Sequence, residues 1–159
     1  MIHTRQAGPL DARPMAELLN AIIAKGGTTA LTDPVTSGDL RGWMATPGAI
    51  WTVAEGDDGA LMGFQWVEPL PDLPPDTVSI ATFSRVGQTG LGIGSALFVA
   101  TVEASKRAGF RWISAEIRDD NIGGLTYYKS RGFEEVGRKA GIRLGNGLIV
   151  GKVLTRYEL

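Results

Sequence analysis

Eight residues in the second half of the chain, QTGLGIGS at positions 88–95, contain three glycines within five positions and lead directly into an apolar stretch. Glycine weakens both helices and strands, so a cluster of this kind needs a backbone or packing reason. The preceding segment, Thr77–Val86, is rich in β-branched and apolar residues and predicts a strand. The following segment starts near Ile93, repeats apolar residues about one turn apart and stops at Gly109, which predicts a helix. The glycines therefore join a strand to a helix N-terminus.

A strand, a glycine-rich turn and a helix N-terminus can together bind an anion. The first amides of a helix have no carbonyl partner, and the helix dipole favours negative charge there. Gly90, Gly92 and Gly94 would let the backbone approach a phosphate closely, and Ser95 would add a hydroxyl. The same glycines would also suit a tight connection that binds nothing, and the residues alone leave both interpretations open. The spacing lacks the lysine of a P-loop and differs from the G-x-G-x-x-G of dinucleotide-binding folds.

The composition limits the kind of protein to which such a turn belongs. With 43% apolar and 21% charged residues, the 159-residue chain is expected to form one domain over positions 1–159. The formal net charge of −1 gives no sign of a nucleic-acid or membrane partner. The chain has no cysteine and only His3 as a histidine, which excludes thiol catalysis and multi-histidine metal sites, so no metal is expected. Without a spanning apolar run or a signal-peptide pattern, a cytoplasmic protein is expected.

The rest of the chain alternates irregularly between strand and helix patterns. Asp11 is expected to cap a first helix that the KGG segment ends, and Asp39 to start a short second helix through Trp43. Two apolar runs around the turn cluster Gly56–Gly59 predict a hairpin. The other expected elements are a strand at 1–6, a strand at 110–117, a helix at 122–130 and two final strands around LGNG at 144–147. This order of elements does not fit a doubly wound parallel fold.

Two segments resemble the motifs of the GNAT superfamily of N-acetyltransferases. That family carries [QR]-x-x-G-x-[GA] between its fourth strand and the next helix, and Thr89–Gly94 falls in this register with Thr89 at the leading Gln or Arg position. NIGGLTYYKSRGF, Asn121–Phe133, is similar to the family's second motif, an Asn followed by a helix that ends in an aromatic-Tyr pair and then Gly-Phe. The segments GGTTA (26–30) and RYEL (156–159) also resemble a phosphinothricin-acetyltransferase-like branch.

The resemblance implies an α+β fold. The family has a mixed, mostly antiparallel sheet of about six to seven strands, flanked by about four helices and splayed between strands four and five. It also implies acetyl-CoA as cosubstrate. Backbone amides of Gly90–Ser95 would hold the pyrophosphate, the exposed edge of the fourth strand would pair with the pantetheine arm, and Asn121 would bond the cofactor or the strand opening. The implied cofactor-binding residues are Phe83, Ser84, Arg85, Thr89, Gly90, Leu91, Gly92, Ile93, Gly94, Ser95 and Asn121.

The resemblance further implies direct attack of a primary amine on the thioester. Tyr128 occupies the family's tyrosine position and would give a proton to the departing thiolate, because a phenol can donate to a developing anion. Tyr127 is expected to pack in the core. Glu116 is the named candidate for the base that takes the proton of the amine, with Glu55, Glu68 or a chain of water molecules as alternatives.

The expected acceptor is a small amine, such as an amino acid or an analogue, and the family resemblance allows a homodimer.

Two other classes of function stay open at this stage. A GNAT-fold module that binds CoA without catalysis is the alternative, which Thr89 favours. A Rossmann-like nucleotide binder is the third class, and it would bind NAD in place of acetyl-CoA.

Overall fold

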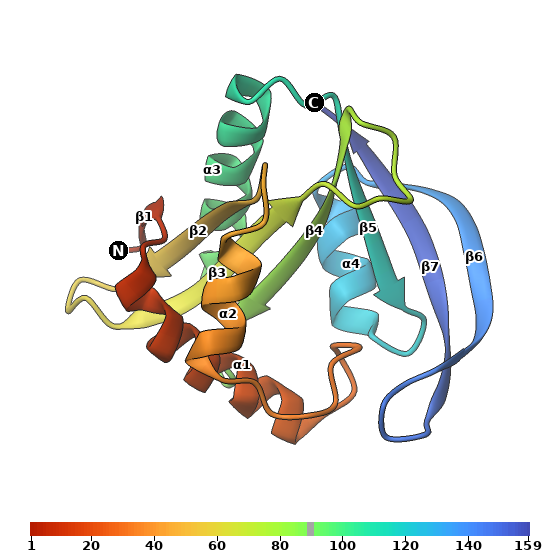
Figure 1. The fold of residues 1–159 in the computed structure, drawn as a ribbon, viewed down its shortest axis with the longest axis horizontal. Coiled ribbons are helices and arrows are strands. Elements are labelled where there is room, and N and C mark those ends of the chain that lie inside the picture. Colours follow the sequence, from red (N-terminus) through yellow and green to blue (C-terminus); the bar gives the residue numbers. More distant parts are fainter. Residues whose placement is uncertain (89–90) are drawn as a thin grey trace.

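The computed structural model describes residues 1–88 and 91–159 and contains a seven-stranded sheet in the order β1-β2-β3-β4-β5-β7-β6 (Figure 1). β4 and β5 run parallel, and the other neighbouring strands pair antiparallel. The strands are β1 (His3–Gln6), β2 (Ile50–Glu55), β3 (Leu61–Glu68), β4 (Thr77–Ser84), β5 (Trp112–Arg118), β6 (Glu134–Arg143) and β7 (Ile149–Glu158). This mixed sheet confirms the expected fold class.

Within the described residues, four α-helices cover the two faces of the sheet, two on each (Figure 1). The helices are α1 (Ala12–Lys25), α2 (Ser37–Met44), α3 (Ile93–Arg107) and α4 (Ile122–Ser130), and a 3₁₀ turn, η1 (Pro9–Asp11), precedes α1. No helix within residues 1–88 and 91–159 has the length and apolar character needed to cross a bilayer.

The side of the sheet under α1 and α2 has an aromatic core. Trp51, Phe64 and Trp66 stack with nearly parallel rings, and the centroids of the two tryptophan rings are 4.1 Å apart. Phe83 of β4 packs on the same group, with its ring 5.2 Å from that of Phe64. Because side chains alternate across a strand, Thr82 and Ile80 face the opposite side, where α3 and α4 lie. The aromatic core therefore fixes which residues of β4 face α4.

The first two helices begin differently from the sequence expectation. Asp11 stands at the N-cap position of α1, but its carboxylate accepts hydrogen bonds from Gly8 N and from the Arg5 guanidinium instead of capping the helix. α2 begins at Ser37, because Thr36 caps it in a reciprocal pair with Asp39. The expectation that Asp39 starts this helix was wrong by two residues, since Asp39 is the third residue of the helix in this capping box.

β4 and β5 pair over only a short part of their length. Thr77–Ser79 pair with Trp112–Ser114, and beyond these residues the two strands separate. β4 continues to Ser84 on its partner β3, while β5 continues to Arg118 on its partner β7. The expected splay between the fourth and fifth strands is therefore present, and Figure 1 shows it as the widening between β4 and β5.

Gly63 of β3 sets how closely the start of α3 and the end of β4 approach each other. A Cβ atom there would lie 2.7 Å from Phe83 O and 2.9 Å from Ile93 Cγ2. We predict that Gly63→Ala lowers the free energy of unfolding by about 1–3 kcal/mol, because overpacking against a backbone atom forces the strand or the helix to move. Urea denaturation of the purified variant measures this change.

Gly42→Ala is the matched control, because Gly42 lies exposed in α2 and its added Cβ would meet nothing within 4 Å. This control should leave stability unchanged or raise it by up to about 1 kcal/mol, since Ala has the higher helix propensity. Equal effects of the two substitutions would show that the close approach at Gly63 does not constrain the fold.

Candidate active site

A cleft of about 680 Å³ lies where β4 and β5 separate. Its walls come from the end of β4, the end of β5, the first turn of α3, helix α4 and the loop that follows α1. Most of the residues implied by the family resemblance border this cleft: Phe83, Ser84, Arg85, Gly92, Ile93, Gly94, Ser95, Glu116, Asn121 and Tyr128. Leu91 is 57% exposed and is not among them. Thr89 and Gly90 lie outside the described residues.

The backbone of β4 offers hydrogen-bonding groups to the cleft from alternate residues. Arg85 N donates to Met62 O of β3 at 2.8 Å, so its backbone amide points away from the cleft. Because an antiparallel ladder alternates, Phe83 also points its backbone groups toward β3, while Thr82 and Ser84 point theirs toward the gap. The Phe83 ring packs in the aromatic core, and the Arg85 guanidinium donates to Leu61 O at 2.9 Å. Of Phe83, Ser84 and Arg85, the residues by which the fourth strand was expected to bind the cofactor, Ser84 is the one whose backbone faces the gap, and Thr82 does so as well.

The first turn of α3 borders the cleft beyond the end of β4. Its N-cap is Gly92 with φ of +80°, a left-handed conformation that favours glycine. The first helical bond joins Ala96 N to Gly92 O, so the amides of residues 93–95 have no carbonyl partner in the helix. Arg131 at the end of α4 donates to Ser95 Oγ at 2.7 Å and brings a positive charge to the same turn. The sequence analysis gave Arg131 no role, although this residue lies within the second motif, Asn121–Phe133.

Gly94 is a glycine for a reason that the sequence did not reveal. A Cβ atom on Gly94 would lie 2.7 Å from Cε1 of the Tyr127 ring. The Tyr127 hydroxyl donates to Gly94 O at 2.7 Å, so this tyrosine both packs on the turn and bonds it. Glycine is therefore required at Gly94 because the Tyr127 ring leaves no room for a side chain, and it is favoured at Gly92 because the backbone is left-handed there.

Tyr128 reaches the cleft from α4 and is otherwise buried. Its hydroxyl lies 2.8 Å from Thr82 Oγ1 on β4. Burial raises the pKa of the Tyr128 phenol well above its ordinary value, with the hydrogen bond to Thr82 opposing this in part. Tyr128 therefore carries its proton at neutral pH, which a proton donor requires.

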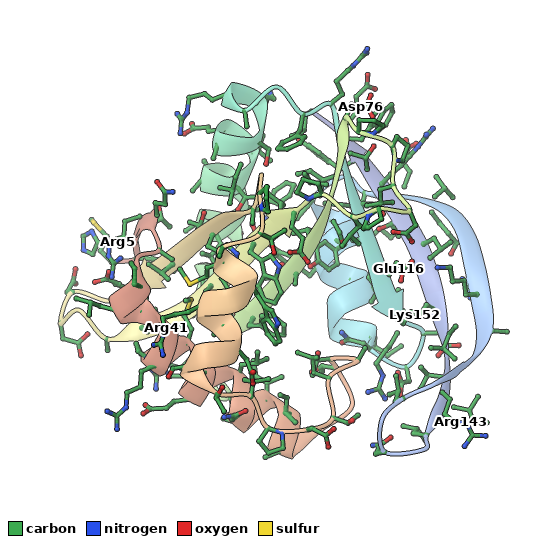
Figure 2. The ribbon with its side chains drawn as sticks, viewed as in Figure 1. Arg5, Arg41, Asp76, Glu116, Arg143 and Lys152 are labelled. Atoms are coloured by element: carbon green, nitrogen blue, oxygen red, sulfur yellow. The ribbon has the colours of Figure 1, made fainter. Side chains whose placement is uncertain are left out.

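Glu116 lies on β5 and contacts lysines of the adjacent strand β7 and of β6 beyond it. Lys139 Nζ donates to its carboxylate at 2.8 Å, and Lys152 Nζ lies 3.6 Å away. Figure 2 labels Glu116 and Lys152, which lie next to each other. Partial burial raises the pKa of Glu116, but the hydrogen bond and the charges of the two lysines outweigh it, so the pKa lies below the ordinary value. A carboxylate held in this way is a weak base. Of the alternative bases, Glu55 and Glu68 do not border the cleft.

Asn121 and Arg118 attach the loop after α1 to this end of the sheet. Asn121 caps α4 by accepting from Gly124 N at 3.0 Å, and its amide donates to Thr28 O at 3.3 Å. Arg118 is 5% exposed, donates to Thr29 O at 2.9 Å and makes two hydrogen bonds with Asp120. The sequence analysis treated the RDDN segment only as a helix start and missed Arg118. An arginine at the end of an apolar strand, two residues before an aspartate, was the available signal.

Comparison with known proteins identifies this arrangement. A structure provisionally described as a phosphinothricin N-acetyltransferase superposes with a TM-score of 0.88 and 26% identity over 100% of this chain and 99% of its own. A GNAT superfamily phosphinothricin acetyltransferase from Sinorhizobium meliloti, solved with acetyl-CoA, has a TM-score of 0.89 at 20% identity, covering 99% of this chain and 88% of its own. The chain has the GNAT fold. The suspected resemblance is thereby confirmed.

Sequence comparison finds another acetyltransferase. A mycothiol acetyltransferase from Kocuria rhizophila is 28% identical in an alignment of 109 residues that covers 63% of this chain and 36% of the relative. The chain thus spans about a third of the length of that curated relative. No family model matches the sequence. In the GNAT fold of this chain, one cleft is bordered by the separated ends of β4 and β5, by the first turn of α3 and by Tyr128 of α4.

Arg118 provides a test of how the cleft wall is built. We predict that Arg118→Met lowers the free energy of unfolding by about 1–3 kcal/mol, because it leaves Thr29 O without its buried donor. Urea denaturation measures the loss, and limited proteolysis should show faster cleavage within residues 26–36.

Arg138→Met is the control, because Arg138 is an exposed arginine that also donates to a carboxylate, that of Glu135. It should change stability by less than about 0.5 kcal/mol, as exposed ion pairs do. A similar loss in both variants would contradict the anchoring role of Arg118.

Proposed function

We propose that this protein is an acetyl-CoA-dependent N-acetyltransferase that moves the acetyl group to a primary amine of a small molecule, such as an amino acid or an analogue. The observation that carries the proposal is the splay after Ser79 and Ser114, which opens a cleft onto the N-terminus of α3. This cleft has the shape, the backbone groups and the charge that an extended anionic thioester needs. The structural relatives include acetyltransferases solved with acetyl-CoA.

The two ends of the cleft suit the two chemical parts of acetyl-CoA. The amide chain of pantetheine would pair with the backbone groups that Thr82 and Ser84 direct into the gap. The pyrophosphate would meet the amides of residues 93–95, with Arg131 beside them. The side chains that border the cleft carry positive charge at Lys25, Arg85, Arg118, Arg131 and Lys152, and negative charge at Glu116. This excess of positive charge favours an anionic ligand although the whole chain is slightly acidic.

The proposed reaction is a direct transfer. The amine nitrogen attacks the thioester carbonyl carbon, a C–N bond forms, the C–S bond breaks and the electron pair stays on sulfur. Tyr128 donates its proton to that sulfur, and the proton lost by the amine passes to water or to Glu116. The Tyr128 phenolate then regains a proton from water. The ion pairs of Glu116 with Lys139 and Lys152 favour the water path, because they stabilise its ionised form. Products are the N-acetylated amine and the free CoA thiol.

The acceptor would enter from the side of the loop after α1. Thr28, Thr29 and Lys25 border the cleft there, and Arg118 and Asn121 hold the loop in place. Because α1 and α3 cover opposite faces of the sheet, an amine that enters beside α1 would reach the thioester without crossing the pyrophosphate. The proposal of a small acceptor rests on this bounded entrance and on the family resemblance.

The proposal predicts acetyl-CoA turnover that depends on the Tyr128 hydroxyl. The wild-type protein with a panel of amino acids and small amines should release free CoA thiol, measured with DTNB. Tyr128→Phe should lower kcat by about 10²-fold or more, the range for a general acid, because it keeps the ring and removes the proton. The dissociation constant of acetyl-CoA should change little, because the hydroxyl matters mainly once charge develops on sulfur.

A thermal-shift series with acetyl-CoA and NAD separates the classes of function. Ligand at 100 times its dissociation constant should add about 2.7 kcal/mol to the stability of the protein, and NAD should add nothing. Stabilisation by acetyl-CoA without turnover of any amine would favour a CoA-binding module. Absence of stabilisation at millimolar acetyl-CoA would contradict the proposal.

A further inference from the structure

A partly buried network of hydrogen bonds connects Tyr128 to the first turn of α3. Gln65 of β3, which is 0% exposed, lies at its centre. The Gln65 amide nitrogen donates to Thr82 Oγ1 at 2.8 Å and to the Tyr127 hydroxyl oxygen at 3.2 Å. Thr82 Oγ1 in turn lies 2.8 Å from the Tyr128 hydroxyl, and Tyr127 lies 2.7 Å from Gly94 O. The sequence analysis predicted none of these hydrogen bonds.

The direction of the bonds on the Tyr127 side follows from counting protons. Gly94 O is a carbonyl and only accepts, so the single Tyr127 proton is used there. The Tyr127 oxygen must then accept from Gln65, which requires the nitrogen of the amide at that point. With the amide turned over, two oxygens would face each other without a proton between them. The orientation of the Gln65 amide is therefore determined by Tyr127.

The same nitrogen determines the direction on the Tyr128 side. It donates to Thr82 Oγ1, so the threonine oxygen is already an acceptor and its own proton needs a partner. Within residues 1–88 and 91–159, the Tyr128 oxygen lies 2.8 Å from Thr82 Oγ1, and the Tyr127 oxygen nearby already accepts from Gln65. Thr82 then donates and Tyr128 accepts, which leaves the Tyr128 proton free to point elsewhere. Because Tyr128 borders the cleft, its O–H bond can point into the cleft.

We propose that Thr82 is a positioning residue that turns the Tyr128 O–H toward the sulfur of the acyl donor. This inference rests on the proposed acetyltransferase function. Thr82 touches no reacting atom through its hydroxyl; it acts by occupying the Tyr128 oxygen as an acceptor. The bonds from Gln65 through Thr82 to Tyr128 all run in one direction, so each polarises the next and makes the last phenol a better donor. Without Thr82, Tyr128 would keep its proton but lose its preferred direction.

The kinetic test is a double-mutant cycle with matched threonine variants. Thr82→Val removes the hydroxyl and keeps the branched shape, and Thr82→Ser keeps the hydroxyl. Thr82→Val should lower kcat about tenfold, the loss expected for one hydrogen bond, and leave the dissociation constant of acetyl-CoA within about twofold. Thr82→Ser should stay within about twofold of wild type in both quantities. In a Tyr128→Phe background, Thr82→Val should have almost no effect on kcat, since no phenol proton remains to be directed.

The result against the inference is equally specific. An equal loss of kcat in the wild-type and Tyr128→Phe backgrounds would show that Thr82 only maintains packing. Melting temperatures of all variants report whether they fold.

Neutron diffraction of deuterium-exchanged wild-type crystals tests the same inference without any activity. The inference predicts deuterium on Thr82 Oγ1 along the line to Tyr128 and deuterium on Tyr128 directed into the cleft. A Tyr128 deuterium that points to Thr82 overturns it. A wild-type protein without acetyl transfer would contradict the proposed function alone, because the neutron map decides the direction of the bonds in either case.

Discussion

The feature on which the site depends is the end of hydrogen bonding between β4 and β5 after three residue pairs. A backbone amide or carbonyl away from water needs a partner, so a parallel pair that separates inside a sheet leaves groups to be satisfied by something else. Thr82 and Ser84 direct such groups into the gap. The cleft, its lining and the proposed pairing with an amide-containing arm all follow from this one interruption of the sheet.

The rest of the fold holds the two strands apart in a defined geometry. The aromatic core of Trp51, Phe64, Trp66 and Phe83 fixes β4 from one side, which fixes the side chains that β4 shows to α4. Arg118 secures the loop after α1 to the end of β5. The cleft is thus a consequence of well-packed elements on both of its sides, and its tyrosines reach it from a helix whose N-cap, Asn121, is bonded to that same loop.

Local patterns predicted most of the elements, and the family motifs indicated residues that border the cleft. The turn cluster Gly56–Gly59 and the helix stop at Gly109 depend on neighbouring residues only, so the sequence predicts them. Contacts between distant segments were not predictable in this way. Gly94 is small because of Tyr127, which lies 33 positions later, and Glu116 meets lysines from two later strands. Thr82 and Gln65 look like ordinary strand residues until β3, β4 and α4 come together.

Single-residue amide hydrogen exchange, followed by NMR with and without acetyl-CoA, tests most directly the claim that the splay receives the acyl donor. The amides of Thr82 and Ser84 face the gap, whereas those of Phe83 and Arg85 point to β3, as the bond from Arg85 N to Met62 O shows. Saturating acetyl-CoA should slow exchange at Thr82 and Ser84 by about tenfold or more and change Phe83 and Arg85 much less, because a new partner forms only on the gap side. Uniform slowing over all four amides, or no slowing at Thr82 and Ser84 with the ligand bound, would contradict the account.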